Sequence, residues 1–413
     1  MLLIDKFKKY STLGKNFSYL MLLQASTTLI QFFMYPYIIR VVGLSNWGIV
    51  VFAQNIVSFF SIFINFGLDV VSVKEISIHR NNKKKMSQIF SSVFCLKTIF
   101  FLISFVVYFV LVNMIPSFKN SEKVFYYSFC FCIAEWLLPM WFFQGIEKME
   151  YITYITLSSK LLLAACVFVF IKSEMDFYLI PLFNGIGSLL GGVIGLYFVI
   201  VKYKMKITVP QKALIKEYFY SSVPIFLSKG VIIIKDKTNL ILISYFLGTS
   251  EVAIYDIGEK IRALIGLIQT IINKVIYPKV VVEKDMKFVK KIIIINEIVI
   301  FAIVCVLQIF LKHVFIFFTG SSIDDLLPIR ILLLIPFITA FSIPLSSNCM
   351  LVFGRAKALL VGMVLTTLFY LFTASIFILF FEKTLMTYTL LATFTFLFEL
   401  LYRFIYTKKS KLF

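Results

Sequence analysis

Charged residues are scarce in this chain. Asp, Glu, Lys and Arg make up 15% of its 413 residues, whereas about a quarter of the residues of a typical soluble domain are charged. Hydrophobic residues make up 60% of the chain, which is above the roughly 50% that soluble domains use. This composition excludes an ordinary soluble protein and predicts an integral membrane protein with several spans.

The residue patterns of enzymes and metal sites are also missing. The sequence has no GxxxxGK[ST] motif, so it does not supply a nucleotide-driven motor of its own. Its two histidines, His79 and His313, are far apart and lack the spacing of metal ligands. The six cysteines lie in apolar runs without CxxC spacing: Cys95, Cys130, Cys132, Cys166, Cys305 and Cys349. No segment between the apolar runs is long enough for a soluble catalytic domain, and we therefore expect no catalytic residues, no metal and no cofactor.

Long apolar runs dominate what is present. A helix needs roughly 20 apolar residues to cross a bilayer, and twelve runs meet that length. The first contains Pro36 and Arg40 and lacks a small-residue cleavage site, so we expect a membrane helix rather than a cleaved signal peptide. We predict an all-α integral membrane fold with twelve transmembrane helices near 17–42, 48–70, 89–113, 124–143, 152–171, 178–200, 217–247, 253–276, 291–318, 327–352, 358–380 and 386–406.

Positive charge is unevenly distributed between the predicted spans. The net charge is +20, and most of the 41 Lys and Arg residues lie in the terminal segments and the even-numbered loops. By the positive-inside rule, both termini and these loops are cytoplasmic. Because topology explains the basic excess, we expect the lipid bilayer and not nucleic acid as the partner of this charge.

The second half of the sequence repeats part of the first. Gly43, Ser45, Ile49 and Ile56 recur as Gly248, Ser250, Ile254 and Ile261, in each case after the first span of a six-span group. Six spans is an even number, so both copies enter from the same side and are related by an axis along the membrane normal. We predict two six-helix lobes, residues 1–207 and 208–413, with substrate bound between them.

Ionisable residues within the spans are the candidate site, because charge at that depth is costly unless it faces a cavity or a partner. The span 217–247 carries Lys229 and Lys237 near Asp236, and the repeat matches Gln54 of span two with Glu259 of span eight. We predict a cationic substrate-binding cavity from these and similar residues: Lys97, Lys160, Lys229, Lys237, Lys260, Arg262 and Arg40. Three carboxylates are candidates for charge pairing or ion coupling: Asp69, Asp236 and Glu259.

Alternatives to this cavity remain open. Lys260 can pair with Asp256, and Arg262 with Glu259, on one face of a helix. Arg40 can extend to the membrane interface instead of contacting substrate. For the lysines without a carboxylate nearby in the sequence, we expect unpaired positive charge in the bundle.

The spans also contain three further carboxylates and a group of three prolines. Glu135, Glu297 and Glu399 are either structural partners of the lysines or proton carriers. The tenth span contains three prolines at regular spacing, which predicts a bending element: Pro328, Pro336 and Pro344.

Four segments resemble the Wzx-type flippases of O-antigen and capsule repeat units, a family of the MOP superfamily. They are PYIIRVVGLSNWG (36–48), INFGLDVVSVKEIS (64–77), WFFQGIEKM (141–149) and YDIGEKIRALI (255–265). The resemblance implies a MATE/MOP-like fold and a carrier that moves an undecaprenyl-diphosphate-linked oligosaccharide to the periplasmic leaflet. It also implies a polysaccharide polymerase and a chain-length regulator as partners.

The predicted cavity suits this substrate, because a diphosphate cannot cross hydrocarbon unless charge-assisted hydrogen bonds replace its hydration. One alternative is a MATE-like drug or cation antiporter, which we expect to favour carboxylates over lysines. The other is a non-transporting scaffold of the polysaccharide assembly machinery.

Overall fold

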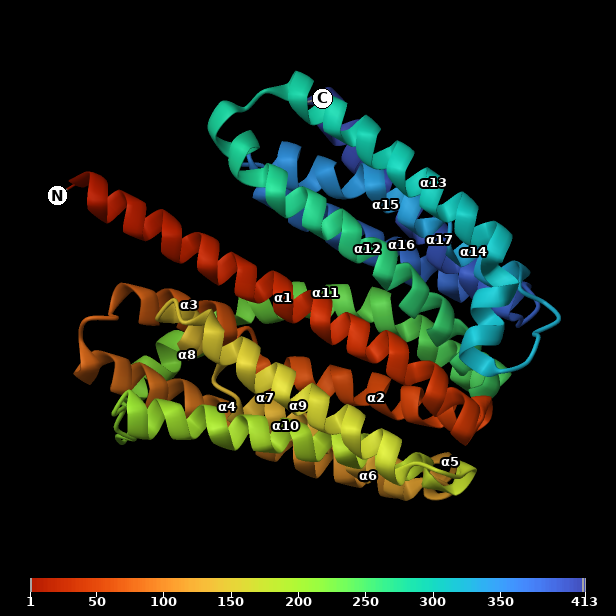
Figure 1. The fold of residues 1–413 in the computed structure, drawn as a ribbon, viewed down its shortest axis with the longest axis horizontal. Coiled ribbons are helices and arrows are strands. Elements are labelled where there is room, and N and C mark those ends of the chain that lie inside the picture. Colours follow the sequence, from red (N-terminus) through yellow and green to blue (C-terminus); the bar gives the residue numbers. More distant parts are fainter. Residues whose placement is uncertain (1, 411, 413) are drawn as a thin grey trace. The chain divides into compact units, whose positions relative to one another are not determined.

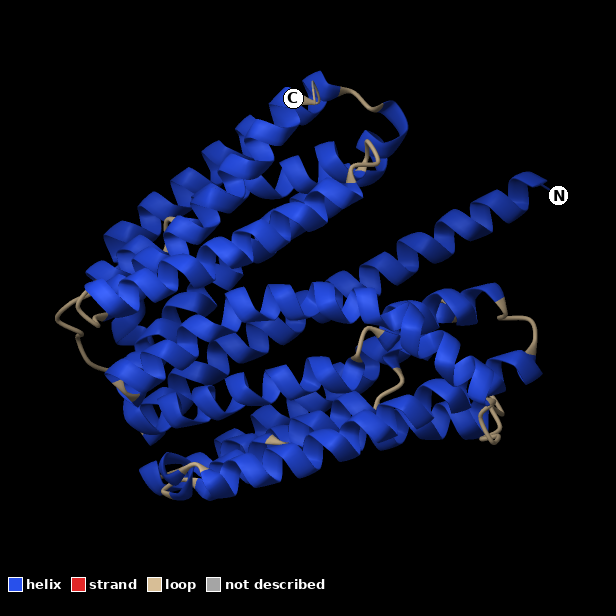
Figure 2. Ribbon diagram, turned by 180° about the vertical axis from the view of Figure 1, so that it is seen from behind, coloured by secondary structure: helices blue, strands red, loops and turns tan. Residues whose placement is uncertain are grey.

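The computed structural model describes residues 2–410 and residue 412. These residues form helices and connecting loops, and the described part of the chain contains no β-strand (Figure 2). This confirms the predicted all-α class. In the described residues, nine helical segments are long and apolar enough to cross a membrane: Leu44–Ile78, Lys83–Met114, Glu122–Gly145, Met149–Phe170, Glu174–Lys202, Met286–Thr319, Leu327–Leu351, Ala356–Phe380 and Leu385–Lys409.

Three further helices coincide with the remaining predicted spans. They are α1 (Leu2–Val42), α11 (Lys212–Leu247) and α12 (Thr249–Glu283). Each carries more charged residues than the nine segments above, and α11 and α12 hold most of the candidate site residues. A total of twelve membrane crossings therefore remains a prediction.

The chain divides into two compact units, Met1–Gly230 and Val231–Phe413. The division lies inside α11, because the first half of α11 packs into unit 1. There the rings of Phe219 and Phe226 stack on Phe66, with centroids 5.2 and 4.4 Å apart. The two six-helix lobes remain a prediction.

Unit 1 contains ten α-helices in addition to the first half of α11, and two short helical turns (Figure 1). After α1, its elements are α2 (Leu44–Asn65), α3 (Leu68–Ile78), α4 (Lys83–Met114), α5 (Pro116–Lys119), α6 (Glu122–Ser128), α7 (Cys130–Leu137), α8 (Met140–Gly145), α9 (Met149–Phe170), η1 (Glu174–Tyr178), α10 (Leu179–Tyr197) and η2 (Phe198–Lys202).

The second predicted span is broken between α2 and α3. Phe66 and Gly67 both have left-handed backbone angles, with φ of 46° and 75°. A Cβ atom on Gly67 would lie 2.8 Å from the side chain of Ile225, so only glycine fits there. Phe66 is held in its unfavourable conformation by stacking on three rings, those of Phe219, Phe226 and Phe100.

The fourth predicted span is broken too, between α7 and α8. Leu138 is extended and Pro139 follows it, as expected because the residue before a proline disfavours the helical conformation. Beyond the two breaks, α3 packs closely on α8, since a Cβ atom on Gly145 would lie 2.5 Å from the side chain of Ile76.

Small residues let α10 approach its neighbours closely. A Cβ atom on Gly185 would lie 2.2 Å from Cβ of Cys130 on α7, and one on Gly187 would lie 2.9 Å from the carbonyl oxygen of Ser159 on α9. Such glycine faces are typical of helices that pack in membranes. They bring the polar residues of α9 and α10 together.

Unit 2 begins with the second half of α11 (Figure 1). Its elements are α12, α13 (Met286–Thr319), α14 (Leu327–Leu332), α15 (Ile335–Pro344), η3 (Leu345–Leu351), α16 (Ala356–Phe380) and α17 (Leu385–Lys409). The tenth predicted span is interrupted at residues 333–334 and changes to π-helical winding after Pro344. Pro344 has no N–H for the carbonyl of Ala340, and Asn296 Nδ2 of α13 donates to that carbonyl instead, at 2.9 Å.

The repeat has a local structural counterpart. Gly43 joins α1 to α2 with φ 81° and ψ 160°, and Gly248 joins α11 to α12 with φ 93° and ψ −179°. Two glycines that correspond in the sequence thus make the same tight joint between long helices. Superposition of the two halves remains a prediction.

Candidate functional site

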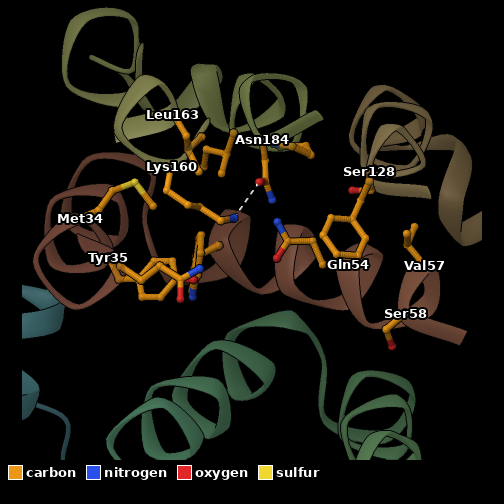
Figure 3. Close-up of a pocket in the computed structure, with 14 residues that line it drawn as sticks. Met34, Tyr35, Gln54, Val57, Ser58, Ser128, Lys160, Leu163 and Asn184 are labelled. Atoms are coloured by element: carbon orange, nitrogen blue, oxygen red, sulfur yellow. Dashed lines mark hydrogen bonds between the residues drawn. The ribbon is translucent and has the colours of Figure 1, made fainter. Parts of the chain in front are cut away.

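Unit 1 contains a cavity of about 240 Å³ between α1, α2, α6, α7, α9 and α10 (Figure 3). Its wall combines aromatic and aliphatic side chains with three carboxamides, three hydroxyls (one of them phenolic) and one ammonium group. The lining residues are Gln31, Met34, Tyr35, Trp47, Gln54, Val57, Ser58, Ser128, Phe131, Lys160, Leu163, Ile180, Pro181 and Asn184.

Lys160 supplies the only charge in this wall. Its Nζ atom donates to Oδ1 of Asn184 at 3.2 Å, and Gln54 lies beside this pair (Figure 3). In the described part of the chain, no carboxylate lies within 4.0 Å of its ammonium group. An ammonium group has three donors, so the amide of Asn184 leaves two of them for a ligand.

The geometry of this cavity favours an anion or a hydroxyl-rich ligand. Charge-assisted hydrogen bonds from an ammonium are about twice as strong as neutral ones. The carboxamides of Gln31, Gln54 and Asn184 can both donate and accept, which suits sugar hydroxyls. Lys160 was predicted as a site residue, whereas Gln31 and Asn184 were missed. The sequence alone does not mark a neutral amide in an apolar run as a site residue, because its role depends on neighbours that only the structure shows.

Lys229 has a carboxylate partner, so the expectation of unpaired charge is wrong for this residue. Its Nζ atom lies 2.8 and 2.9 Å from the oxygens of Asp69, which is 160 residues away in the sequence. Both side chains are about one third exposed, at 32% and 34%. The charge pairing considered for Asp69 is therefore present in the structure.

Lys97 is buried next to this ion pair. Its Nζ atom donates to the carbonyl oxygen of Glu135 at 2.9 Å, in the last turn of α7. Such carbonyls lack a partner within the helix and attract a cation. Asn65 Nδ2 donates to Oε2 of Glu135 at 3.3 Å, and the N–H of Asp69 donates to Oδ1 of Asn65 at 3.4 Å. One polar network thus joins the two helix breaks of unit 1.

Two candidate basic residues of unit 2 are paired with carboxylates along α12. Lys260 contacts Asp256, and Arg262 Nε donates to Glu259 at 3.0 Å. These are the local pairs that the sequence left as the alternative to a charged cleft, and the structure confirms them. Lys237 lies near Lys260 and is half-buried.

A second network in unit 2 agrees with one of the two alternatives considered for Glu399, a structural partner of lysines, although the lysine itself was not predicted. Glu399 of α17 contacts both Arg403 and Lys235, and Nζ of Lys235 lies 3.0 Å from its carboxylate. Lys235 also lies 3.6 Å from Asp236 and stacks over the ring of Phe396. The i,i+4 spacing of Glu399 and Arg403 could have predicted their ion pair. Lys235 is 164 residues from Glu399 in the sequence, so no spacing pattern could have predicted their contact.

Two cavities adjoin these charges. A cavity of about 30 Å³ lies between Lys235, Asp236, Asn239, Tyr255, Glu259, Arg262, Tyr370, Ala392, Thr395 and Phe396. That volume holds about one water molecule. A second cavity, of about 110 Å³, is lined by Ile232, Lys235, Met363, Thr366, Thr367 and Glu399. In the described part of unit 2, the charged side chains that line these two cavities are held in ion pairs.

The remaining predicted residue, Arg40, is exposed in the last turn of α1 and interacts with neighbouring groups. Since Lys229 belongs to unit 1 while Lys237 and Lys260 belong to unit 2, a cavity shared by all three remains a prediction.

The chain resembles known proteins in sequence and in structure. A family described as "Polysaccharide biosynthesis protein" matches residues 13–282. A protein of Escherichia coli K12 named "Putative O-antigen transporter" is 25% identical over 289 residues, which are 69% of each chain. A protein of the same name from Shigella dysenteriae is 24% identical over 266 residues, which cover 64% of this chain and 66% of that protein.

Solved structures share the fold. An inward-facing MATE-family multidrug transporter of the MOP superfamily gives a TM-score of 0.69 at 16% identity, covering 95% of this chain and 99% of that one. A MOP-superfamily transporter from Pyrococcus furiosus, described as having a binding pocket of reverse polarity, gives 0.61 at 18% identity and covers 95% and 93%. These matches confirm the MATE-like helical fold.

The structural matches establish the fold alone, but the family match covers more than half of the chain and agrees with the resemblance of its four sequence segments to Wzx-type flippases. The chain therefore belongs to the family described as "Polysaccharide biosynthesis protein".

Proposed function

We propose that this protein moves an undecaprenyl-diphosphate-linked oligosaccharide, a repeat unit of O-antigen, capsule or exopolysaccharide, from the cytoplasmic to the periplasmic leaflet. It works by alternating access in the bacterial inner membrane, with twelve membrane helices in two lobes and both termini in the cytoplasm. It is a carrier and not an enzyme. The polymerase and the chain-length regulator act on its product.

The observation that carries this proposal is the ammonium group of Lys160 in a polar cavity. A lone cation within a membrane helix is costly unless it serves a ligand. Its amide partner, Asn184, leaves its charge uncompensated, so a phosphate or another anion gains a full charge-assisted contact. The carboxamides around it can meet the hydroxyl groups of the first sugar.

The paired lysines form a second candidate anion site. Lys229 and Lys260 each hold a carboxylate that a substrate phosphate could displace, and Lys237 lies near Lys260. In this proposal the three lysines bind the diphosphate in another conformation of the transport cycle, after Asp69 and Asp256 have moved away. Lys160 has no such partner to lose, and for this reason it is the first residue to test.

A cation antiporter is less well supported. A cationic drug needs a carboxylate that is available to it, and the cavity of unit 1 is lined by an ammonium group and by neutral side chains. Within α12, the carboxylates Asp256 and Glu259 are already paired with basic residues. The charge of the cavity therefore favours an anionic substrate.

The test replaces Lys160 in cells whose own repeat-unit flippase has been deleted. Lys160→Ala should reduce surface polysaccharide per molecule of membrane protein by about tenfold or more, since one charge-assisted hydrogen bond contributes roughly 1.5 to 3 kcal/mol. Lipid-linked repeat units should accumulate in the cytoplasmic leaflet. Lys160→Arg keeps the charge and serves as the matched control, with most export retained. Normal export by Lys160→Ala at equal protein abundance would contradict the proposed site.

A further inference from the structure

Helix α13 carries a single carboxylate, Glu297. The apolar segment of this helix has a mean hydropathy of 2.7, the highest of the nine candidate spans. Both carboxylate oxygens are buried, and neither has a hydrogen-bond partner in the described part of the chain. Glu297 thus differs from the buried Glu399, whose carboxylate meets two basic side chains.

The charged groups near Glu297 do not compensate it. α15, which packs along α13, has no ionisable residue. The ionisable groups on the facing half of α12, on α13 itself and on η3 make no hydrogen bond or ion pair with Glu297 in the described structure: Lys274, Tyr277, Lys279, Glu283, Lys290, Lys291 and Cys349. Lys279 is paired with Glu283.

An ionised carboxylate in this place would be expensive. Burial of a charged group without partners costs far more than burial of its neutral form, and within a membrane there is no water to offset the difference. No group of three or more acidic, His or Cys side chains that could hold a metal ion occurs among the described residues. A proton is therefore the ligand that neutralises Glu297 at the lowest cost.

Glu297 also lies beside the element of unit 2 that is most able to bend. The preceding residue, Asn296, is 1% exposed and donates its amide to the carbonyl of Ala340, which Pro344 leaves without its helical partner. The Oδ1 atom of Asn296 is buried without a partner. α13 is thus attached, at the level of Glu297, to the proline-interrupted segment α15–η3.

We propose that Glu297 is a proton-binding site that is loaded and unloaded as the α15–η3 segment moves against α13. Binding forms one carboxyl O–H bond with a proton from water, and release returns that proton to water. The protein in the present conformation holds the proton, and a conformation in which α15–η3 has moved exposes the carboxyl group. This inference goes beyond the proposed function and does not depend on which substrate is carried.

The test uses a hydrophobic carbodiimide on the full-length protein in native membranes, because such reagents modify protonated carboxyl groups in apolar surroundings. Mass spectrometry should find the adduct on Glu297. Its yield should fall by about tenfold per pH unit once the pH exceeds the midpoint of the group. Glu399 in the same sample is the matched control and should stay unmodified, since it is ion-paired.

Two results would overturn the proposal. Absence of the adduct at every pH would show that Glu297 is ionised or inaccessible. A yield that does not change with pH would show a permanently neutral, structural acid. The variant Glu297→Gln should lose the adduct at this position, and export by it should no longer respond to an imposed pH gradient. Because the labelling needs no transported lipid, it remains informative if the flippase proposal fails.

Discussion

At the scale of single residues, the basic side chains within the helices fall into two groups. Carboxylates hold Lys229, Lys235, Lys260, Arg262 and Arg403. Neutral groups hold two others, a side-chain amide for Lys160 and a backbone carbonyl for Lys97. A buried ion pair lowers the cost of each charge without providing a site. For this reason the number of lysines in the spans overstates the positive charge that is available to a substrate.

Loss of Glu399 should be costly, because it would leave Lys235 and Arg403 buried without their shared counter-charge. We expect Glu399→Gln to destabilise the protein by about 3 to 5 kcal/mol. The measurement is the unfolding temperature in detergent, together with abundance in the membrane. Glu283→Gln is the matched control, since its pair with Lys279 is half-exposed, at 51% and 48%, and should contribute at most about 1 kcal/mol. Equal stability of the two variants would contradict the buried network.

At the scale of elements, the breaks within the predicted spans are what distinguish this fold from a set of straight helices. Pro139 separates α7 from α8, and Gly67 separates α2 from α3. The sequence predicted a bending element in the proline-rich tenth span; the structure shows that this span is interrupted and changes winding after Pro344, and its bending remains a prediction. The sequence did not predict the break at Phe66, because an aromatic residue in the left-handed region depends on rings that lie far away in the chain.

Substitution at the joint between α2 and α3 tests its importance. Gly67→Ala should lower stability by about 1 to 3 kcal/mol, since it combines a positive φ with a Cβ contact of 2.8 Å to Ile225. Gly230→Ala is the control within helix α11, where nothing lies within 4 Å of the added atom, and it should be neutral or stabilising by roughly 0.5 to 1 kcal/mol. Thermal unfolding of both variants decides the question. A stable Gly67→Ala protein would mean that this joint can relax.

At the scale of the whole molecule, composition and periodicity predicted far more of the fold than of the site. Apolar runs located the helices because the bilayer requires them. The cavity of unit 1 could not be foreseen, since it depends on which faces of α1, α2, α9 and α10 meet. The same holds for the partner of Lys229, because no pattern of spacing connects Asp69 to a lysine 160 residues away.

Orientation in the membrane is the prediction that concerns the whole chain. The basic segment that contains Lys206 follows the sixth predicted span, and the segment that contains Lys383 joins the eleventh to the twelfth. Since an odd number of spans separates them, a fluorescent protein fused after Lys206 should fluoresce in the cytoplasm, and alkaline phosphatase fused after Lys383 should be active in the periplasm. Exchanging the two reporters provides the control, because both signals should then disappear. If the two positions report the same side, at least one of the predicted spans between them does not cross the bilayer. The proposed arrangement of two six-helix lobes would then be wrong.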